Sequence, residues 1–203
     1  MSRLFVLSPA HCGGERARIL LHEDARFDLA RRLRTPPGVP LGEAFAFLSG
    51  LYFRGKLAYA LAFVRPPARC AGILVITPTD GLLPAHAPVD VAGLRRFGSV
   101  GIDAGDVRYG APLLRDVERI ARRIGPHGEV VLLGSVATGK YVDVLAPVLG
   151  ERLRFPSEFV GRGDMSRGGL LLRRVAEGRE LDYIPITGAA RHGPRPPRLP
   201  PRP

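Results

Sequence analysis

Three segments of the chain carry residues that could do chemistry, and the first is Gly134-Ser-Val-Ala-Thr-Gly-Lys140. It follows an apolar run at 130–133 and precedes a helical pattern. A strand, a glycine-containing turn and a helix in this order can bind phosphate, because the first amides of a helix have no partner within it. A triphosphatase needs Ser or Thr after the lysine to bind Mg²⁺, whereas this chain has Tyr141. The segment is therefore either a phosphate site, with Lys140 and the amides near Ser135 as donors, or a plain strand-to-helix turn.

The second segment, at 159–169, reads Phe-Val-Gly-Arg-Gly-Asp-Met-Ser-Arg-Gly-Gly and combines four glycines with two arginines, Arg162 and Arg167. Glycine lets a backbone pass close to a ligand, and a guanidinium offers paired N–H groups to a phosphate. The amides near Ser166 are further donors. The alternative interpretation is a flexible basic loop without a ligand.

The third segment, Thr77-Pro-Thr-Asp-Gly-Leu-Leu-Pro-Ala-His86, follows a predicted buried strand at 72–77. Ligands of open α/β sheets bind beyond the carboxyl ends of strands, so Asp80 and Gly81 are well placed for a site. Pro-x-Asp-Gly is also a common turn sequence, and the segment could be no more than that. The five histidines lack the spacing of zinc ligands, so we predict neither a metal site nor a cofactor.

The charge of the chain supports an anionic partner only where arginines cluster. The chain has 203 residues, with 30 basic and 19 acidic side chains and a net charge of +11. Only Lys56 and Lys140 are lysines, and such an arginine excess can arise without a functional reason. Clustering is therefore the informative feature. The arginines cluster at 162–174 and at 191–202.

The elements that must position these residues follow from hydrophobic periodicity. Helices that separate strands predict a single α/β domain over residues 1–190, with a mixed sheet flanked by helices. A C-terminal hairpin is predicted from the apolar runs at 170–175 and 181–186. The expected strands are 4–7, 72–77 and 130–133. The first expected helix is 15–34, with a break near Asp24, and the second runs from an N-cap at Ser49 to Val64. Two further helices are expected at 113–124 and 141–149.

Residues 191–203 are rich in proline and arginine, so neither helix nor sheet is available to them. This tail could be solvated without function, a basic arm on nucleic acid, or a ligand for a proline-binding partner. No apolar run approaches the roughly 20 residues of a membrane span, and the N-terminal apolar stretch is too short for a signal peptide. We therefore expect a cytoplasmic protein with no membrane partner, in which Cys12 and Cys70 are free thiols. The sequence does not predict the oligomeric state.

Five segments, taken in chain order, resemble those of the YaaA family, which is associated with the peroxide stress response. The most specific is Arg162-Gly-Asp-Met-Ser-Arg167, which is similar to the family's Arg-Gly-x-Met-Ser-Arg motif. This chain departs from the family pattern at His11, Asp80, Lys140 and Phe159, so it resembles a remote branch. The other similar segments are Ser8-Pro-Ala-His11, Ser49-Gly-Leu-Tyr52, Thr77-Pro-Thr-Asp-Gly-Leu-Leu-Pro84 and Ser135-Val-Ala-Thr-Gly-Lys-Tyr141.

The resemblance implies a fold related to those of DNA glycosylases, DNA binding, and a role in protection against oxidative damage or in nucleobase processing. It places Ser8, His11, Asp80 and Tyr141 in a pocket, with Gly81 beside it, and lets Tyr141 or Phe159 stack on an unpaired base. If there is catalysis, Asp80 would hold water or stabilise positive charge while His11 donates a proton to the leaving base.

Two other classes of function compete with DNA binding. The chain could be an enzyme acting on a free nucleotide or nucleoside, with the phosphate held by Gly134–Lys140. It could also be a non-enzymatic interaction module that captures partners through its proline-rich tail. Ligand-induced stabilisation by nucleotides would favour the first alternative, and loss of partner capture on deletion of 191–203 would favour the second.

Overall fold

A six-stranded mixed sheet organises the protein in the computed structural model, which describes residues 2–197 and 199. The strand order is β4-β3-β1-β6-β7-β8, with the four inner strands parallel and both edge strands antiparallel to their neighbours. The predicted mixed α/β fold is confirmed. The strands are β1 (Arg3–Leu7), β3 (Ile73–Thr77), β4 (Gly81–Pro84), β6 (Glu129–Leu133), β7 (Leu153–Pro156) and β8 (Tyr183–Pro185).

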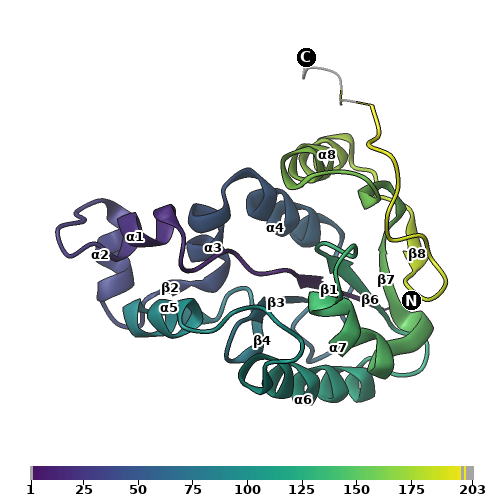
Figure 1. Ribbon diagram of the computed structural model, residues 1–203, viewed down its shortest axis with the longest axis horizontal. Coiled ribbons are helices and arrows are strands. Elements are labelled where there is room, and N and C mark those ends of the chain that lie inside the picture. Colours follow the sequence, from purple (N-terminus) through teal and green to yellow (C-terminus); the bar gives the residue numbers. More distant parts are fainter. Residues whose placement is uncertain (1, 198, 200–203) are drawn as a thin grey trace.

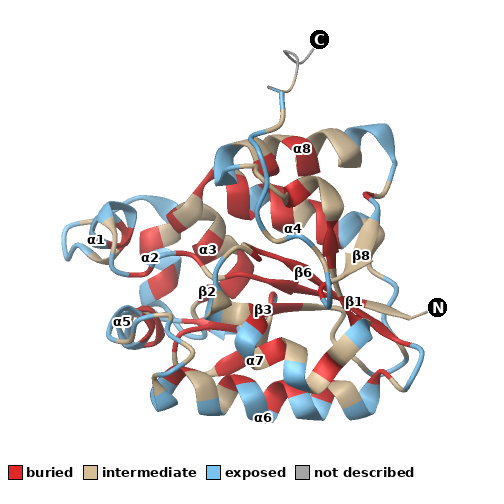
Figure 2. Ribbon diagram, turned by 45° about the vertical axis from the view of Figure 1, so that its right-hand side comes forward, coloured by how far each residue is buried: buried red, intermediate tan, exposed pale blue. Residues whose placement is uncertain are grey.

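The central strands β1, β3 and β6 are apolar except at their ends, because both faces of the sheet are covered. In β1, Phe5 and Leu7 point into one core, whereas Leu4 and Val6 point into the other. Alternate residues of a strand face opposite sides, so one short run of sequence contributes to two cores. Figure 2 shows the buried residues gathered on the strands and on the helix faces turned towards them.

Two pairs of helices form the outer layers (Figure 1). On one face lie α4 (Leu51–Phe63) and α8 (Asp164–Glu177), and on the other lie α6 (Val107–Arg123) and α7 (Gly139–Leu149). The helices of each pair pack against one another. Short 3-10 turns occur at Gly150–Arg152 and Ser157–Phe159.

A smaller helical lobe lies beyond the carboxyl end of β1 (Figure 1). The break near Asp24 is confirmed, because the predicted helix is divided into two. The third helix of the lobe was not predicted, since Pro36-Pro37-Gly38 suggested only a stop. The lobe comprises α1 (Glu15–Leu21), α2 (Asp28–Arg34), β2 (Val39–Pro40), α3 (Leu41–Ser49), β5 (Pro88–Val89) and α5 (Val91–Gly98).

The predicted C-terminal hairpin is wrong. Its first half is the body of α8, which buries Leu170 and Leu171 and ends at Gly178 in the left-handed conformation. A short apolar run does not distinguish a strand from a turn of buried helix, and the glycines before it concealed the start of the helix. The second half forms β8, which pairs with β7.

The predicted N-cap of α4 is also wrong. Ser49 is the last residue of α3, and Gly50, with a positive φ of 63°, separates the two helices. The face of α4 that is buried carries Tyr52, Lys56 and Tyr59, whereas Leu61 of the predicted apolar stripe is 64% exposed. This helix is apolar on several sides, so periodicity alone did not identify the buried one.

The described part of the tail, 191–197 and 199, contains neither helix nor strand, as predicted. It lies against the segment before α8, where a Cβ at Gly161 would collide with the Pro194 carbonyl oxygen. The remainder of the predicted tail, 198 and 200–203, lies outside the described residues. Within the described part of the chain, none of the helices has the length and apolar character needed to cross a membrane.

Candidate functional site

The candidate site lies where the chain connections diverge at the carboxyl edge of the sheet. In the sheet, β3 lies on one side of β1 and β6 lies on the other, so the direction in which successive strands are added reverses between β1 and β6. Ligands of open α/β sheets bind at the carboxyl ends of the strands at such a switch point. Ser8 directly follows β1, and Gly134 directly follows β6. A Cβ at Gly134 would lie 2.9 Å from the Ser8 Cβ, so glycine allows the two segments to meet.

Lys56 reaches this point from α4. Its Nζ donates hydrogen bonds to the Ser8 carbonyl oxygen at 2.6 Å and to the Ser8 Oγ at 2.8 Å. The same nitrogen lies 4.5 Å from the centroid of the Tyr52 ring and 4.8 Å from that of Phe53. Lys56 is 1% exposed, and no salt bridge among the described residues includes it. The ammonium group is thus held by oxygens and aromatic faces instead of a carboxylate.

The surroundings of Lys56 favour the neutral amine. Burial lowers the pKa of Lys56 to about 7, because the charged form loses its hydration. The carboxylate of Asp164 opposes this decrease, and the guanidinium of Arg167 adds to it. Both residues belong to the first turn of α8, so this helix helps to set the charge of the site.

Two tyrosines complete the polar cluster. Burial raises the pKa of Tyr141 to about 12, although its contact with Ser8 acts in the opposite direction. Burial also raises the pKa of Tyr52, and Arg167 partly offsets this. The Tyr52 hydroxyl is buried, and the Arg167 guanidinium approaches it without a well-aligned hydrogen bond. Both phenols therefore remain protonated at neutral pH.

A cavity of about 350 Å³ lies beyond the ends of β1 and β3, and its wall includes Ala10 and Lys140, which are close in sequence to Ser8 and Tyr141 of the cluster. His11 and Pro78 line it from the sheet side, Lys140 from the first turn of α7, and Phe97 from the end of α5. The loop 98–102 completes its wall. Its size lies within the range of small-molecule sites, and His11 and Lys140 offer it polar groups.

The structure brings Asp80 near this cavity without placing it in the wall. The Asp80 carboxylate accepts hydrogen bonds from Arg96 at 2.7 and 3.2 Å and from the Thr79 hydroxyl at 2.7 Å. The Arg96 guanidinium lowers the pKa of Asp80, which keeps it ionised. Gly81, at a positive φ of 68°, faces α6, where a Cβ would strike the carboxylate of Asp116. Gly81 therefore serves the turn and its packing.

The predicted phosphate loop has a carboxylate beside its helix start. A Cβ at Gly139 would collide with the Asp143 carboxylate, which places negative charge next to the first amides of α7. Lys140 is exposed and Ser135 is half-buried in the loop before the helix. A phosphate in this position would be repelled by Asp143, so Lys140 is better placed to meet an anion outside the loop.

The two predicted phosphate-binding arginines differ in exposure. Arg167 is 6% exposed and donates to the Phe159 carbonyl oxygen at 3.1 and 3.3 Å, with an ion pair to Asp164 at 3.4 Å. The half-buried Arg162 donates to the Glu158 carbonyl oxygen at 3.0 Å and to Ser166 Oγ at 3.3 Å. A pocket of about 380 Å³ between α8 and the tail includes Arg162 and Ser166 in its wall. Arg162 is thus the more accessible of the two.

The glycines of the segment 159–169 serve packing as well as access. A Cβ at Gly55 of α4 would lie 2.7 Å from the Gly168 carbonyl oxygen, and a Cβ at Gly168 would lie 2.9 Å from that of Leu51. The crossing of α4 and α8 therefore depends on glycine in both helices. This close crossing brings Arg167 and Asp164 next to Lys56.

Lys56 is the central residue that the sequence analysis missed. A signal was present, since one of only two lysines stands in a mostly apolar helical stretch, four residues after Tyr52 and three before Tyr59. A charged residue at core spacing indicates a buried polar contact. Among the described residues, no group of three or more His, Cys, Asp or Glu side chains is arranged to hold a metal ion.

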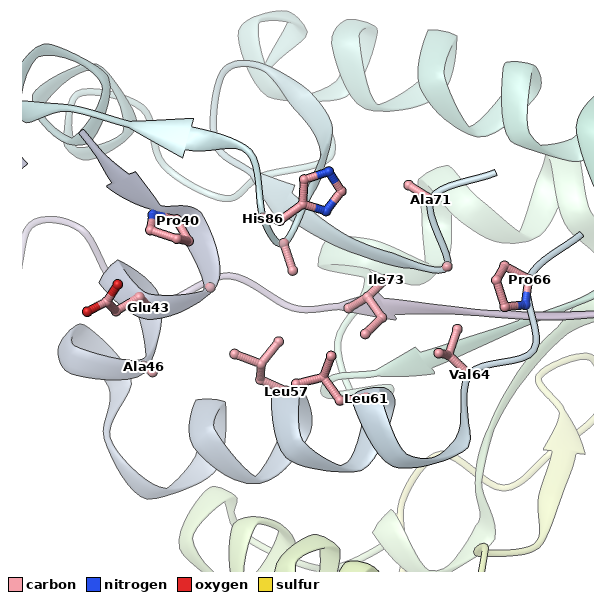
Figure 3. A pocket seen from close by; sticks show the side chains of 13 residues that line it. Pro40, Glu43, Ala46, Leu57, Leu61, Val64, Pro66, Ala71, Ile73 and His86 are labelled. Atoms are coloured by element: carbon pink, nitrogen blue, oxygen red, sulfur yellow. The ribbon is translucent and has the colours of Figure 1, made fainter. Parts of the chain in front are cut away.

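A larger cavity, of about 580 Å³, lies between α3, α4 and the start of β3 (Figure 3). Its lining is mostly apolar, with Leu57, Leu61 and Ile73 labelled in the figure. Its ionisable lining residues in the described chain are His86 and Glu43, and Glu43 is already paired with Arg32 at 2.7 Å. It offers few groups for chemistry, so we assign the functional site to the carboxyl edge.

The fold and the site define a doubly wound α/β protein with a polar cluster and a cavity at its switch point. Comparison of the chain with protein-family models, with curated proteins and with solved structures finds no significant match in any of the three.

Proposed function

We propose that the protein binds DNA at the carboxyl edge of its sheet and holds an unpaired base in the cavity lined by His11 and Lys140. The observation that carries the proposal is this cavity of about 350 Å³ at the switch point, with the exposed side chains of Lys140 and His11 in its wall. Binding of single strands combines cationic groups with aromatic rings on which bases stack, and the His11 imidazole can serve as such a ring.

The positions of the cationic groups support a path for the phosphate backbone. Asp164, at the start of α8, acts electrostatically on Tyr141 in the first turn of α7. The exposed Lys140 lines the cavity, and the half-buried Arg162 lines the pocket between α8 and the tail, so the proposed path for the backbone runs from one to the other. The resemblance of Arg162–Arg167 to the YaaA motif supports the same path, and the role in oxidative-stress protection rests on that resemblance alone.

The proposal is tested by filling the cavity. Gly101 lines it, and apart from its two chain neighbours no residue has an atom within 4 Å of the position that a Cβ at Gly101 would take. Gly101→Leu should therefore fold normally and occupy the space of the base. We expect it to weaken binding of a single-stranded oligonucleotide by about 1–3 kcal/mol, the value of one stacked base. Fluorescence anisotropy measures this loss.

The matched control is Gly105→Leu in the same loop, because Gly105 is exposed and lies outside the cavity wall. It should leave the affinity unchanged. Equal affinities of wild type and Gly101→Leu for the oligonucleotide would show that no base occupies the cavity, and would contradict the proposal.

An enzyme acting on a free nucleotide is the second candidate, because a cavity of this size also fits a mononucleotide. It predicts that nucleotides raise the melting temperature whereas DNA does not. The carboxylate of Asp143 beside Gly139 argues against a phosphate in the loop Gly134–Lys140.

A further inference from the structure

Ser8 and Lys56 form a buried pair that DNA binding does not use. The Nζ of Lys56 lies 2.8 Å from Ser8 Oγ and 2.6 Å from the Ser8 carbonyl oxygen, which fixes the amine against the hydroxyl. Ser8 is 4% exposed and Lys56 is 1% exposed. A serine hydroxyl and an amine base at hydrogen-bonding distance recur as Ser–Lys catalytic pairs in acyl transfer.

The surroundings of Lys56 suit a base. Its burial against the rings of Tyr52 and Phe53 disfavours the ammonium form, and its pKa is lowered to about 7. The charged groups that act on it come from α8: Asp164 favours the ammonium form and Arg167 disfavours it. The nearby phenols of Tyr52 and Tyr141 have raised pKa values and stay neutral.

The loop after β6 and the start of α7 lie against Ser8. Gly134 is next to the Ser8 side chain, and α7 begins five residues later at Gly139. Tyr141, in the first turn of α7, contacts Ser8. The cavity of about 350 Å³ has in its wall Ala10, two residues after Ser8, and Lys140, which precedes Tyr141, and it is the space that a substrate could occupy.

We propose that Ser8 is a nucleophile and Lys56 its general base, in a site that cleaves a carboxylic ester. The neutral Lys56 amine takes the Ser8 hydroxyl proton as Oγ bonds to the carbonyl carbon, whose π electrons move to the oxygen. Collapse of this intermediate breaks the ester C–O bond, and the Lys56 ammonium returns its proton to the leaving alcohol. Water, deprotonated by Lys56, then hydrolyses the acyl-serine and restores both residues.

A fluorophosphonate probe tests the proposal on the full chain without any DNA, so its outcome is independent of DNA binding. We expect one covalent adduct per chain, mapped to Ser8 by peptide mass spectrometry and lost in Ser8→Ala. The labelling rate should rise about tenfold or more between pH 6 and 8 and level off above, following deprotonation of Lys56.

Lys56→Met keeps a side chain of similar length without a base, and it should label at least 100-fold more slowly. Ser2→Ala is the matched control, since it removes a hydroxyl just before β1, at the opposite end of the strand from Ser8, and should label at the wild-type rate. The pH profile of the wild type carries the test even where Lys56→Met fails to fold. An absence of Ser8 labelling at pH 8.5, a pH-independent rate, or wild-type labelling of folded Lys56→Met would overturn the proposal.

Discussion

Lys56 joins α4 to the end of β1 through two hydrogen bonds to Ser8. Its type is visible in the sequence, but its partner is not, because the contact spans 48 residues. The same holds for Arg167, whose guanidinium looked free for phosphate yet donates to the Phe159 carbonyl oxygen. Residue types therefore indicated the charges of the site, whereas their burial and pairing depend on contacts that no local pattern contains.

Lys56→Met should change how stability depends on pH. The folded pKa of about 7 lies below the ordinary lysine value of 10.5, so between these values the unfolded chain binds more protons and wild-type stability rises with pH. Below pH 7 both states hold the proton, and the difference is constant. Relative to Lys56→Met, the wild type should gain a few kcal/mol in free energy of unfolding from pH 7 to about 10.

Urea unfolding of both proteins at a series of pH values measures this gain. Parallel stability curves across the range would mean that Lys56 keeps an ordinary pKa when folded.

At the scale of elements, the crossing of α4 and α8 holds the site together. It brings the Arg167 side chain towards Lys56, and glycine in each helix permits the approach. Sequence patterns predicted α6 and α7 and the strands β1, β3 and β6, which are marked by continuous apolar runs or clear helical spacing. They predicted the presence of α4, but neither its start nor its buried face. They failed for α8, because its glycine-rich first turns resemble a loop.

Gly168→Ala should destabilise the protein by about 1–2 kcal/mol. Alanine gains up to about 1 kcal/mol in helix propensity, but its Cβ would lie 2.9 Å from the Leu51 oxygen and the Tyr52 Cα, and backbone atoms cannot yield as a side chain does. Gly169→Ala is the control, since its nearest contact is the Leu199 side chain at 3.6 Å. It should be neutral or stabilising by up to about 1 kcal/mol. Urea unfolding measures the free energy of unfolding of both variants. Equal changes in Gly168→Ala and Gly169→Ala would show that α4 and α8 can move apart without loss of stability.

At the scale of the whole molecule, the order of the strands creates the site. The alternation of strands and helices predicted a mixed sheet, and the rule for open sheets directed attention to the segment after β3. The segment after β6 was selected by its phosphate-loop spacing, and the segment after β1 by the family resemblance. Which strands are neighbours is a long-range property, so the sequence could not show that Ser8 and Gly134 meet while Asp80 pairs with Arg96. The residues predicted to form one site therefore lie in three places. His11 and Lys140 line the cavity, Asp80 lies in the turn before β4, and Arg162 and Ser166 line the pocket next to α8.

The net charge of +11 does not by itself predict the binding of an anion, because the binding depends on where the charged side chains lie. Arg115 and Arg119 of α6 pair with the buried Asp116, and Arg3 pairs with Glu129. A carboxylate balances the charge of each of these arginines, so they are less available to a ligand. Lys140 lines the proposed base site, whereas Arg162 lines the pocket between α8 and the tail.

The salt dependence of DNA affinity tests DNA binding at this edge most directly. Fluorescence anisotropy measures the binding of a single-stranded oligonucleotide over a range of salt concentrations. Three proteins are compared: wild type, the double variant Lys140→Ala/Arg162→Ala, and the control Arg122→Ala, which removes an exposed arginine of α6. We predict that affinity falls with salt and that the double variant has a slope shallower by about 1–2 units, while Arg122→Ala matches the wild type. No binding at low salt, or an equal change of slope in Arg122→Ala, would contradict DNA binding at the carboxyl edge of the sheet.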